Sequence, residues 1–391
     1  MIPSERDVER QSSTFELDEP HREFQAVCRA FVQQHIRPLV EQSEQSGEFP
    51  HALWRLLGRH GFLGLGYPDD VGGSGGDNLS IALLSEELAK TSGGIAVTPL
   101  VSSYMAASHL VRSGTAEQQR IFLPPIVAGE TVAAIAVTEP GTGSDVAAIT
   151  TVTVPEGDGY RLRGTKLFIT NGGVADVIIV AAKTDTQARH RGITMFLVEN
   201  GQEGFSVGRP LRKMGWHSSD TRELIFDNCF VPRDRIIGTV GRGFYQIMEG
   251  FQLERIVLAA MGLGLAQAAF DDALAYAKER QSFGQPIGKF QSVRHLLSQM
   301  ATDIQAARLL TYQAAARLDA GLDAAEVVAM AKLFAARVAN RVADDAVQIF
   351  GGYGFIEESH VAMHYRDARI LRIGGGTDEV QMEILAKGLG L

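Results

Sequence analysis

The sequence predicts a multidomain α+β protein with an α-helical N-terminal domain, a middle β-domain and a C-terminal helical bundle. Three observations predict this order. Apolar residues recur at helical spacing from about residue 18 to 130, and short β-type runs separated by turn residues fill 131–240. Long stretches rich in Ala and Leu then occupy 241–391. A length of 391 residues also fits two or three domains.

Within the first region, two helices can be located from their apolar spacing. Apolar side chains repeat three and four residues apart at 24–32 and again at 81–88. Asn78 precedes the second pattern and is its expected N-cap. The glycine-rich stretch YPDDVGGSGGDN, residues 67–78, is expected to be a loop between the two helices.

The middle and last regions differ in the period of their apolar residues. TTVTV at 150–154 and YRLRGTKLFIT at 160–170 flank a turn and indicate a hairpin or meander. Recurrent turn residues favour an antiparallel sheet, as a barrel or sandwich, over βαβ units. The last region contains three long helical stretches at 256–280, 291–318 and 324–350, which are expected to pack as an antiparallel bundle.

Composition excludes several classes of partner. The net charge is −9, so neither nucleic acid nor an anionic membrane is an expected partner. The two cysteines, Cys28 and Cys229, form no CxxC pair, which predicts neither a disulfide framework nor a zinc site. The first twenty residues are polar and acidic, without the apolar core of a signal peptide, and no apolar run reaches the length of a bilayer span. We therefore expect a cytoplasmic protein.

Common catalytic motifs are missing from the sequence. No GxGxxG follows a strand, and no P-loop, GxSxG or HExxH is present. His360 and His364 are spaced to share a helix face, but no third ligand lies near them in sequence, so no metal site is predicted. A nicotinamide-dependent Rossmann enzyme is disfavoured as well.

Two segments of the middle region have side chains suited to a ligand. In AVTEPGTGSD, glycines allow close backbone approach, and Thr138 and Ser144 offer hydroxyls. Taken alone, an ordinary loop is the stronger interpretation of this segment. In LFITNGG, Phe168 and Thr170 are two residues apart, so in a regular strand they would face the same side. Phe168 could then stack on a ring to which Thr170 hydrogen-bonds.

The order of seven motifs makes the chain resemble one family. TEPGTGSD, FITNGG, KMGWHSSDT, GRGFYQIMEGFQLER, KERQSFGQPIGKFQ, QIFGGYGF and YRDARILRIGGGTDEV stand in the order and spacing of the acyl-CoA dehydrogenase family, over residues 21–391. The resemblance implies a helical N-terminal domain, a middle β-domain and a C-terminal four-helix bundle. It also implies FAD, with the flavin ring between the β-domain and the bundle.

The resemblance further assigns roles to individual residues. It places Thr138 near the flavin pyrimidine, Phe168 against the flavin and the Thr170 hydroxyl on flavin N5, and it gives Arg280 and Gln291 the pyrophosphate and adenosine part. The full set of implied FAD contacts is Ile135, Val137, Thr138, Gly143, Ser144, Phe168, Thr170, Arg280, Phe283, Gln291, Gln348, Gly351, Gly352, Thr377 and Glu379. Because family members share each FAD between neighbouring subunits, a homotetramer or homodimer is implied.

The catalytic base departs from the commonest family pattern. Many members carry a glutamate in a C-terminal YEGT-type motif, but this motif reads IGGGT here and Gly375 occupies the glutamate position. The isovaleryl- and long-chain-type branches place a glutamate before an arginine on a bundle helix, as in FQLERIVLAA, where Glu254 precedes Arg255. By sequence alone an ER pair is usually a helix-surface pair. The resemblance and the glycine at 375 reverse that preference.

The resemblance then implies a reaction. Glu254 would remove the α-proton of an acyl thioester and flavin N5 would accept the β-hydride, converting acyl-CoA to trans-2-enoyl-CoA. Apolar neighbours should raise the pKa of the Glu254 carboxyl, as suits a general base near neutral pH. The substrate contacts implied are Ser144, Tyr245, Leu253, Arg255, Gly375 and Gly376. For Tyr245, a core aromatic of the helix is an equal alternative.

Three other functions remain open from the sequence. The same chemistry on an acyl group bound to a carrier protein is the first. The second is a flavin monooxygenase or nitro-compound oxidase on this scaffold, which an intact Glu254 disfavours. The third is a non-catalytic member. An electron-transferring flavoprotein is the electron acceptor that the family implies.

Overall fold

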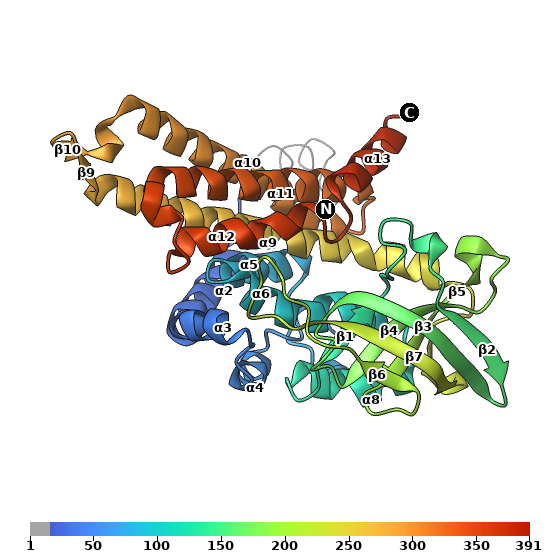
Figure 1. Ribbon diagram of the computed structural model, residues 1–391. Helices are drawn as coiled ribbons and strands as arrows, with labels where there is room; N and C mark the ends of the chain where they lie inside the picture. The colour runs from blue at the N-terminus through green and yellow to red at the C-terminus, as the bar shows by residue number, and fades with distance from the viewer. Residues whose placement is uncertain (1–15) are drawn as a thin grey trace.

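The computed structural model describes residues 16–391, and three regions follow one another along the chain (Figure 1). The N-terminal helices and the β-domain lie side by side beneath the long helices of the C-terminal region. The predicted order of helical, β and helical regions is confirmed. The polar stretch before residue 16, on which the expectation about a leader segment rested, lies outside the described residues.

The N-terminal region is built from short helices around an apolar core. Its helices are α2 (Glu19–Phe31), α3 (Val40–Ser46), α4 (Ala52–Arg59), α5 (Asn78–Ala89), α6 (Gly93–Leu100), α7 (Ser108–Ser113) and α8 (Ala116–Val127), with a π-helical segment at Val101–Ala107. The predicted N-cap of α5 is wrong by one residue. The Asp77 carboxylate accepts the Ser80 N–H, whereas Asn78 begins the helix and donates to Asp319 of the bundle. An ionised carboxylate is a strong acceptor for the first-turn N–H groups.

The middle region forms one eight-stranded sheet in the order β6-β7-β3-β2-β4-β5-β8, with β1 paired to β4. The strands are β1 (Ala133–Ala136), β2 (Val152–Glu156), β3 (Gly159–Thr170), β4 (Val177–Lys183), β5 (Ile193–Glu199), β6 (Phe205–Val207), β7 (Thr221–Pro232) and β8 (Ile236–Ile237). Most pairs are antiparallel, as predicted. The β1–β4 and β2–β4 pairs are parallel, and in both cases the chain returns through β3 before β4 begins, as the crossover of a parallel pair requires.

The C-terminal region is a bundle of α9 (Gly243–Glu279), α10 (Gln291–Asp319), α11 (Ala325–Phe350) and α12 (His360–Ala368), followed by α13 (Asp378–Gly388). A short hairpin of β9 (Gln281–Ser282) and β10 (Gln285–Pro286) joins α9 to α10 at the far end of the bundle (Figure 1). Helix α9 begins thirteen residues before the predicted start at 256. Glycines in this segment obscured its helical pattern in the sequence. Gly250 has a packing role, because a Cβ atom there would lie 2.5 Å from His109 Cε1.

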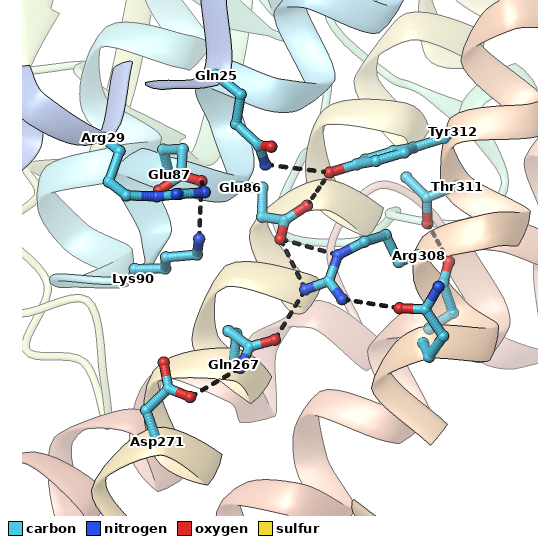
Figure 2. A network of polar contacts seen from close by, with 12 residues as sticks. Gln25, Arg29, Glu86, Glu87, Lys90, Gln267, Asp271, Arg308, Thr311 and Tyr312 are labelled. Atoms are coloured by element: carbon cyan, nitrogen blue, oxygen red, sulfur yellow. Dashed lines mark hydrogen bonds and ion pairs between the residues drawn. The ribbon is translucent and has the colours of Figure 1, made fainter. Parts of the chain in front are cut away.

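A polar network attaches the N-terminal helices to the bundle (Figure 2). The buried Glu86 carboxylate of α5 accepts hydrogen bonds from Arg308 and Tyr312 of α10, at 2.9 and 2.6 Å. Arg308 also donates to the Gln267 side chain of α9 at 2.9 Å. Burying a carboxylate is costly unless it is paired and hydrogen-bonded, and both conditions are met here. The network therefore fixes α5 against both α9 and α10.

Among residues 16–391, two helical stretches, residues 93–113 and α9, are long and apolar enough by length and composition to cross a membrane. The expectation that no apolar run reaches this length was therefore wrong. Within the most apolar window of each stretch, 94% and 78% is buried inside the protein. Their apolar side chains are thus already covered by the rest of the chain, as in the core helices of a globular domain.

Candidate functional site

A buried ion pair supports the loop that follows β1. The Glu139 carboxylate accepts a hydrogen bond from Lys166 Nζ at 2.8 Å, and both side chains are almost fully buried. The Lys166 ammonium, with donors from Thr150 and Thr151, overcomes the opposing effect of burial and lowers the pKa of Glu139 to about 2. The pair is therefore charged at neutral pH and holds the end of β1 against β3.

The same contact brings the two ligand-like segments together. Lys166 Nζ also donates to the Val137 carbonyl at 3.0 Å, and the Leu167 N–H donates to the Thr138 carbonyl at 2.9 Å. Thr138 and Phe168 thus lie on adjacent backbone segments. Ile135, Val137, Thr138 and Thr170 are half-buried, while Gly143 and Ser144 are exposed, so this rim of the β-domain is available to a ligand.

Phe168 does not follow the strand alternation assumed from the sequence. A β-bulge lies between Lys166 and Ile169 in the pairing of β3 with β7, and Phe168 adopts a left-handed backbone with φ of 61°. One extra residue in a strand interrupts the alternation of faces, so the two-residue spacing does not by itself place Phe168 and Thr170 on the same face. The bulge turns the Phe168 ring outward, where 64% of its surface is exposed.

Four glycines in the implied FAD segments border open space. A Cβ atom at Gly141, Gly143, Gly351 or Gly352 would meet no atom within 4 Å. At the β-domain, Gly141 and Gly143 leave room for a flat ring beside the exposed Phe168 ring and the hydroxyls of Thr138, Ser144 and Thr170. Gly351 and Gly352 leave room for another part of the cofactor after the end of α11. These residues therefore fit the FAD that the resemblance implies.

Glu254 lies on α9 among apolar side chains. Its neighbours Leu253, Ile256 and Val257 are buried, and Glu254 itself is partly buried. Within residues 16–391, no hydrogen-bond donor or ion-pair partner reaches its carboxylate. Burial raises the pKa of Glu254 to about 7, even though the charges of Arg255 and Lys332 act to lower it. The site therefore contains a carboxylate that can exchange a proton near neutral pH.

The glycine turn after α12 lies against this carboxylate. A Cβ atom at Gly375 would stand 3.5 Å from Glu254 Oε1, and the φ of Gly375 is +64°. Arg255, which is buried, donates from Nε to the Gly375 carbonyl at 3.4 Å. Gly375 thus lies beside Glu254, with Gly376 next to it in the turn, while Leu253 and Arg255 flank Glu254 on α9. Thr377 caps α13 directly after the turn, and Glu379 is exposed in the first turn of that helix.

The remaining implied FAD residues lie at the opposite end of the bundle. Arg280 ends α9, and its guanidinium lies over the Tyr353 ring at 5.7 Å. Glu254 and Arg280 are separated by twenty-six residues of helix, or about 39 Å at about 1.5 Å per residue. The six implied FAD residues at this end are all exposed: Arg280, Phe283, Gln291, Gln348, Gly351 and Gly352. One chain does not bring them to Glu254.

Tyr245 is also placed away from Glu254. Nine residues of α9 separate the two, so their side chains leave the helix on opposite sides, about 13 Å apart along its axis. The Arg242 guanidinium lies over the Tyr245 ring at 4.1 Å, and His190 lies 5.9 Å from it. The assignment of Tyr245 to an acyl pocket stays a prediction.

Sequence reasoning missed four charged or polar residues of the site: Glu139, Lys166, Lys332 and Gln381. Lys332 could have been noticed, because it interrupts the apolar face formed by Val328, Ala335 and Ala339 on α11. Its side chain is fully buried and donates to the Gly376 carbonyl.

Family models match almost the whole chain. The models described as acyl-CoA dehydrogenase N-terminal, middle and C-terminal domains match residues 18–130, 134–229 and 241–390. These ranges follow the three structural regions in order.

Similar proteins of known sequence and structure cover the same length. A 3-(aryl)acrylate reductase of Clostridium sporogenes is 39% identical over 95% of this chain and 98% of its own. A mitochondrial isovaleryl-CoA dehydrogenase of Solanum tuberosum is 38% identical over 97% and 92%. The structure of butyryl-CoA dehydrogenase from Megasphaera elsdenii matches with a TM-score of 0.94 and 40% identity, covering 97% of this chain and 100% of that one.

Proposed function

Since this chain belongs to the acyl-CoA dehydrogenase family and is an FAD-dependent oxidoreductase of that kind, we propose that Glu254 is the base that removes the α-proton of its acyl thioester. The product is the trans-2-enoyl thioester. The single observation that carries this proposal is the position of the Glu254 carboxylate, 3.5 Å from the Cβ position of Gly375. The carboxylate therefore lies beside the glycine turn where a base at position 375 would begin.

The environment of Glu254 supports this role. Burial raises the pKa of its carboxyl to about 7. A base is most effective when its pKa lies near the working pH, because it is then both ionised and basic enough to accept a carbon-bound proton. Glu254 also makes no hydrogen bond to the described residues, so no contact has to break before it meets the substrate.

The other parts of the reaction would use the rim of the β-domain and the glycine turn. FAD, when bound, supplies the acceptor for the β-hydride. The β-domain rim with Thr138, Ser144, Phe168 and Thr170 would hold the flavin end. The turn with Gly375 would bind the thioester oxygen through backbone N–H groups, which stabilises the negative charge that develops as the α-proton leaves.

The separation of the two ends of the bundle supports an oligomer. Glu254 and Arg280 lie about 39 Å apart along α9, a longer distance than one FAD molecule spans. Arg280 and the exposed Phe283 would therefore serve the FAD of a neighbouring subunit. We therefore propose a homodimer or homotetramer with shared FAD sites. An electron-transferring flavoprotein is the proposed acceptor, and a cytoplasmic location stays a prediction.

The test begins with the spectrum of the purified protein and an anaerobic titration. A panel of acyl-CoAs of different length and branching is added, and flavin absorbance is followed. We expect at least one thioester to bleach the flavin, and Glu254→Gln to retain FAD but lose most of the bleaching rate. Glu249→Gln, an exposed glutamate on the same helix, is the matched control and should bleach normally.

Three results would change this assignment. A Glu254→Gln variant that bleaches at the wild-type rate would exclude Glu254 as the base. Bleaching by a carrier-protein thioester but by no acyl-CoA would move the function to the carrier-bound substrate. Rapid oxygen consumption by the reduced enzyme would favour an oxidase or monooxygenase instead.

A further inference from the structure

Within the described residues, two lysines are fully buried, and they differ in their partners. Lys166 has the Glu139 carboxylate at 2.8 Å. Lys332, on α11, has no carboxylate within ion-pair distance among residues 16–391, and its Nζ donates instead to the Gly376 carbonyl. Moving an ammonium group from water into the protein interior has a desolvation penalty on the order of several kcal/mol. A single carbonyl compensates poorly for that cost, so the position of Lys332 needs an explanation other than stability.

The Lys332 ammonium is one of three donors that hold the glycine turn. The Gly375 carbonyl accepts from Arg255 Nε at 3.4 Å and from Gln381 Nε2 at 3.2 Å. The Gly376 carbonyl accepts from Gln381 Nε2 at 3.1 Å and from Lys332 Nζ. The donors come from α9, α13 and α11, so three helices fix two consecutive peptide groups.

The opposite edges of these peptide groups are unpaired. The N–H groups opposite these two carbonyls belong to Gly376 and Thr377, and neither has an acceptor within the described part of the chain. In a trans peptide the N–H points away from the C=O, so carbonyls held by the bundle helices direct the N–H of the next residue the other way. Gly375 and Gly376 both have positive φ, at 64° and 91°. Successive free N–H groups in such a turn form a concave site for an anion or a carbonyl oxygen.

We propose that Lys332 is a positioning residue for α-proton removal, which anchors the Gly375–Gly376 turn so that its free N–H groups meet the thioester oxygen. The ammonium also places a positive charge behind the turn, near Glu254. This inference rests on the proposed function, because it takes Glu254 as the base. Lys332 does not touch the substrate, since the turn lies between them.

The charge of Lys332 adds to the effect of its hydrogen bond. As the α-proton leaves, negative charge develops on the thioester oxygen, and a fixed cation in a dry site stabilises it. The same cation lowers the pKa of Glu254 and so opposes the effect of burial. The charged groups that face Lys332 are Arg255 and Glu254 of α9 and Asp378 and Glu379 of α13. Burial, helped by Arg255, lowers the pKa of Lys332 to about 8, while the three carboxylates act to raise it.

The test compares two substitutions that separate the hydrogen bond from the charge. Lys332→Met removes both, and Lys332→Gln keeps a donor without the charge. Single-turnover bleaching of the flavin by an acyl-CoA that reduces the wild type is measured from about pH 5.5 to 9.5. FAD content and sedimentation report folding, and Lys387→Met, an exposed lysine at the end of α13, is the matched control.

The expected result is a slower rate together with a shifted pH profile. Lys332→Met should bleach at least about tenfold more slowly near pH 8, a loss typical of a weakened oxyanion site. The acid limb of its pH–rate profile should move to higher pH, because the pKa of Glu254 rises when a neighbouring cation is lost. Lys332→Gln should recover part of the rate but keep the shifted limb. A purely structural lysine would lower the amount of loaded enzyme without moving the limb.

Several outcomes would overturn the inference. One is a loaded Lys332→Met variant with the rate and acid limb of the wild type. If that variant does not hold FAD, Lys332→Gln and Gln381→Leu decide in the same way. The wild type provides a further check, since its rate should fall as pH rises through about 8, and a flat profile to pH 9.5 would contradict the role of the charge. If no thioester bleaches the wild type, or Glu254→Gln is fully active, the proposed function fails instead.

Discussion

Gly375 lies directly against Leu258 of α9, and a Cβ atom at Gly375 would stand 2.3 Å from Leu258 Cδ1. Leu258 is itself buried, so it would have to move to make room. The backbone adds a second constraint, because the φ of +64° at Gly375 favours glycine over any residue with a side chain. The chain therefore keeps its base on α9 and cannot simply return it to the position used by many relatives.

We predict that Gly375→Glu does not restore a base. In a Glu254→Gln background the double variant should remain as slow as Glu254→Gln alone, as measured by anaerobic flavin bleaching. The substitution should also lower the free energy of unfolding by about 1–2 kcal/mol from the left-handed backbone alone. Gly374→Ala is the control, since its φ is not positive and the nearest atom to its Cβ is 3.7 Å away. Recovery of turnover in the double variant would show that a side chain at position 375 can act as the base, contrary to this prediction.

A second prediction concerns how much the buried Glu254 carboxylate destabilises the folded protein. The pKa of Glu254 is raised from 4.5 to about 7 in the folded protein. Between these values the folded state binds a proton that the unfolded state has lost, so the stability of the wild type falls as pH rises, and the whole cost is present above about pH 7. Glu254→Gln removes the charge and should stabilise the protein by about 1–3 kcal/mol at pH 8.

Urea unfolding at pH 5 and pH 8 measures this difference. The advantage of Glu254→Gln over the wild type should be small at pH 5 and larger at pH 8. Glu249→Gln should show no such change with pH. An equal difference at both pH values would mean that the carboxylate of Glu254 is not destabilised in the folded state.

A third prediction concerns the ion pair beneath the β-domain rim. Lys166→Met would leave the Glu139 carboxylate buried without its cation, which typically costs about 3–5 kcal/mol. The loop with Thr138 and Ser144 should loosen, so the variant should lose FAD at a lower temperature than the wild type. Flavin fluorescence during thermal unfolding measures both effects. The double variant Glu139→Gln/Lys166→Met buries no lone charge and should recover much of the loss, and an equally damaged double variant would argue against this cause.

The sequence was sufficient for the three-region fold, because the period of its apolar residues changes from helical to β-type and back. Local conformation that depends on residues far away in the sequence could not be predicted in this way. The bulge at Phe168 depends on how β3 pairs with β7, and the early start of α9 depends on Gly250 meeting His109. Neither pairing leaves a pattern in the nearby sequence.

The candidate site was only partly accessible from the sequence for a related reason. An ER pair is ambiguous on its own, so Glu254 was identified only through the resemblance and the glycine at 375. Lys332 was missed because its acceptor is a backbone carbonyl forty-four residues further along the chain. Backbone groups are identical in every residue, so a side chain that binds one leaves no matching partner to find in the sequence.

The last prediction tests whether FAD sites are shared between subunits. Glu254 and Arg280 lie at opposite ends of α9, so we expect Arg280 of one subunit to serve the Glu254 site of another. Arg280→Ala alone should weaken FAD binding, and Glu254→Gln alone should abolish turnover. When the two variants are co-expressed and purified as mixed oligomers, some sites combine an intact Glu254 with an intact Arg280 from the neighbour. These oligomers should regain bleaching activity well above either parent, whereas parents mixed after purification, without subunit exchange, should not. If Arg280 served the site of its own chain, every mixed site would lack one of the two residues, and co-expression would recover nothing.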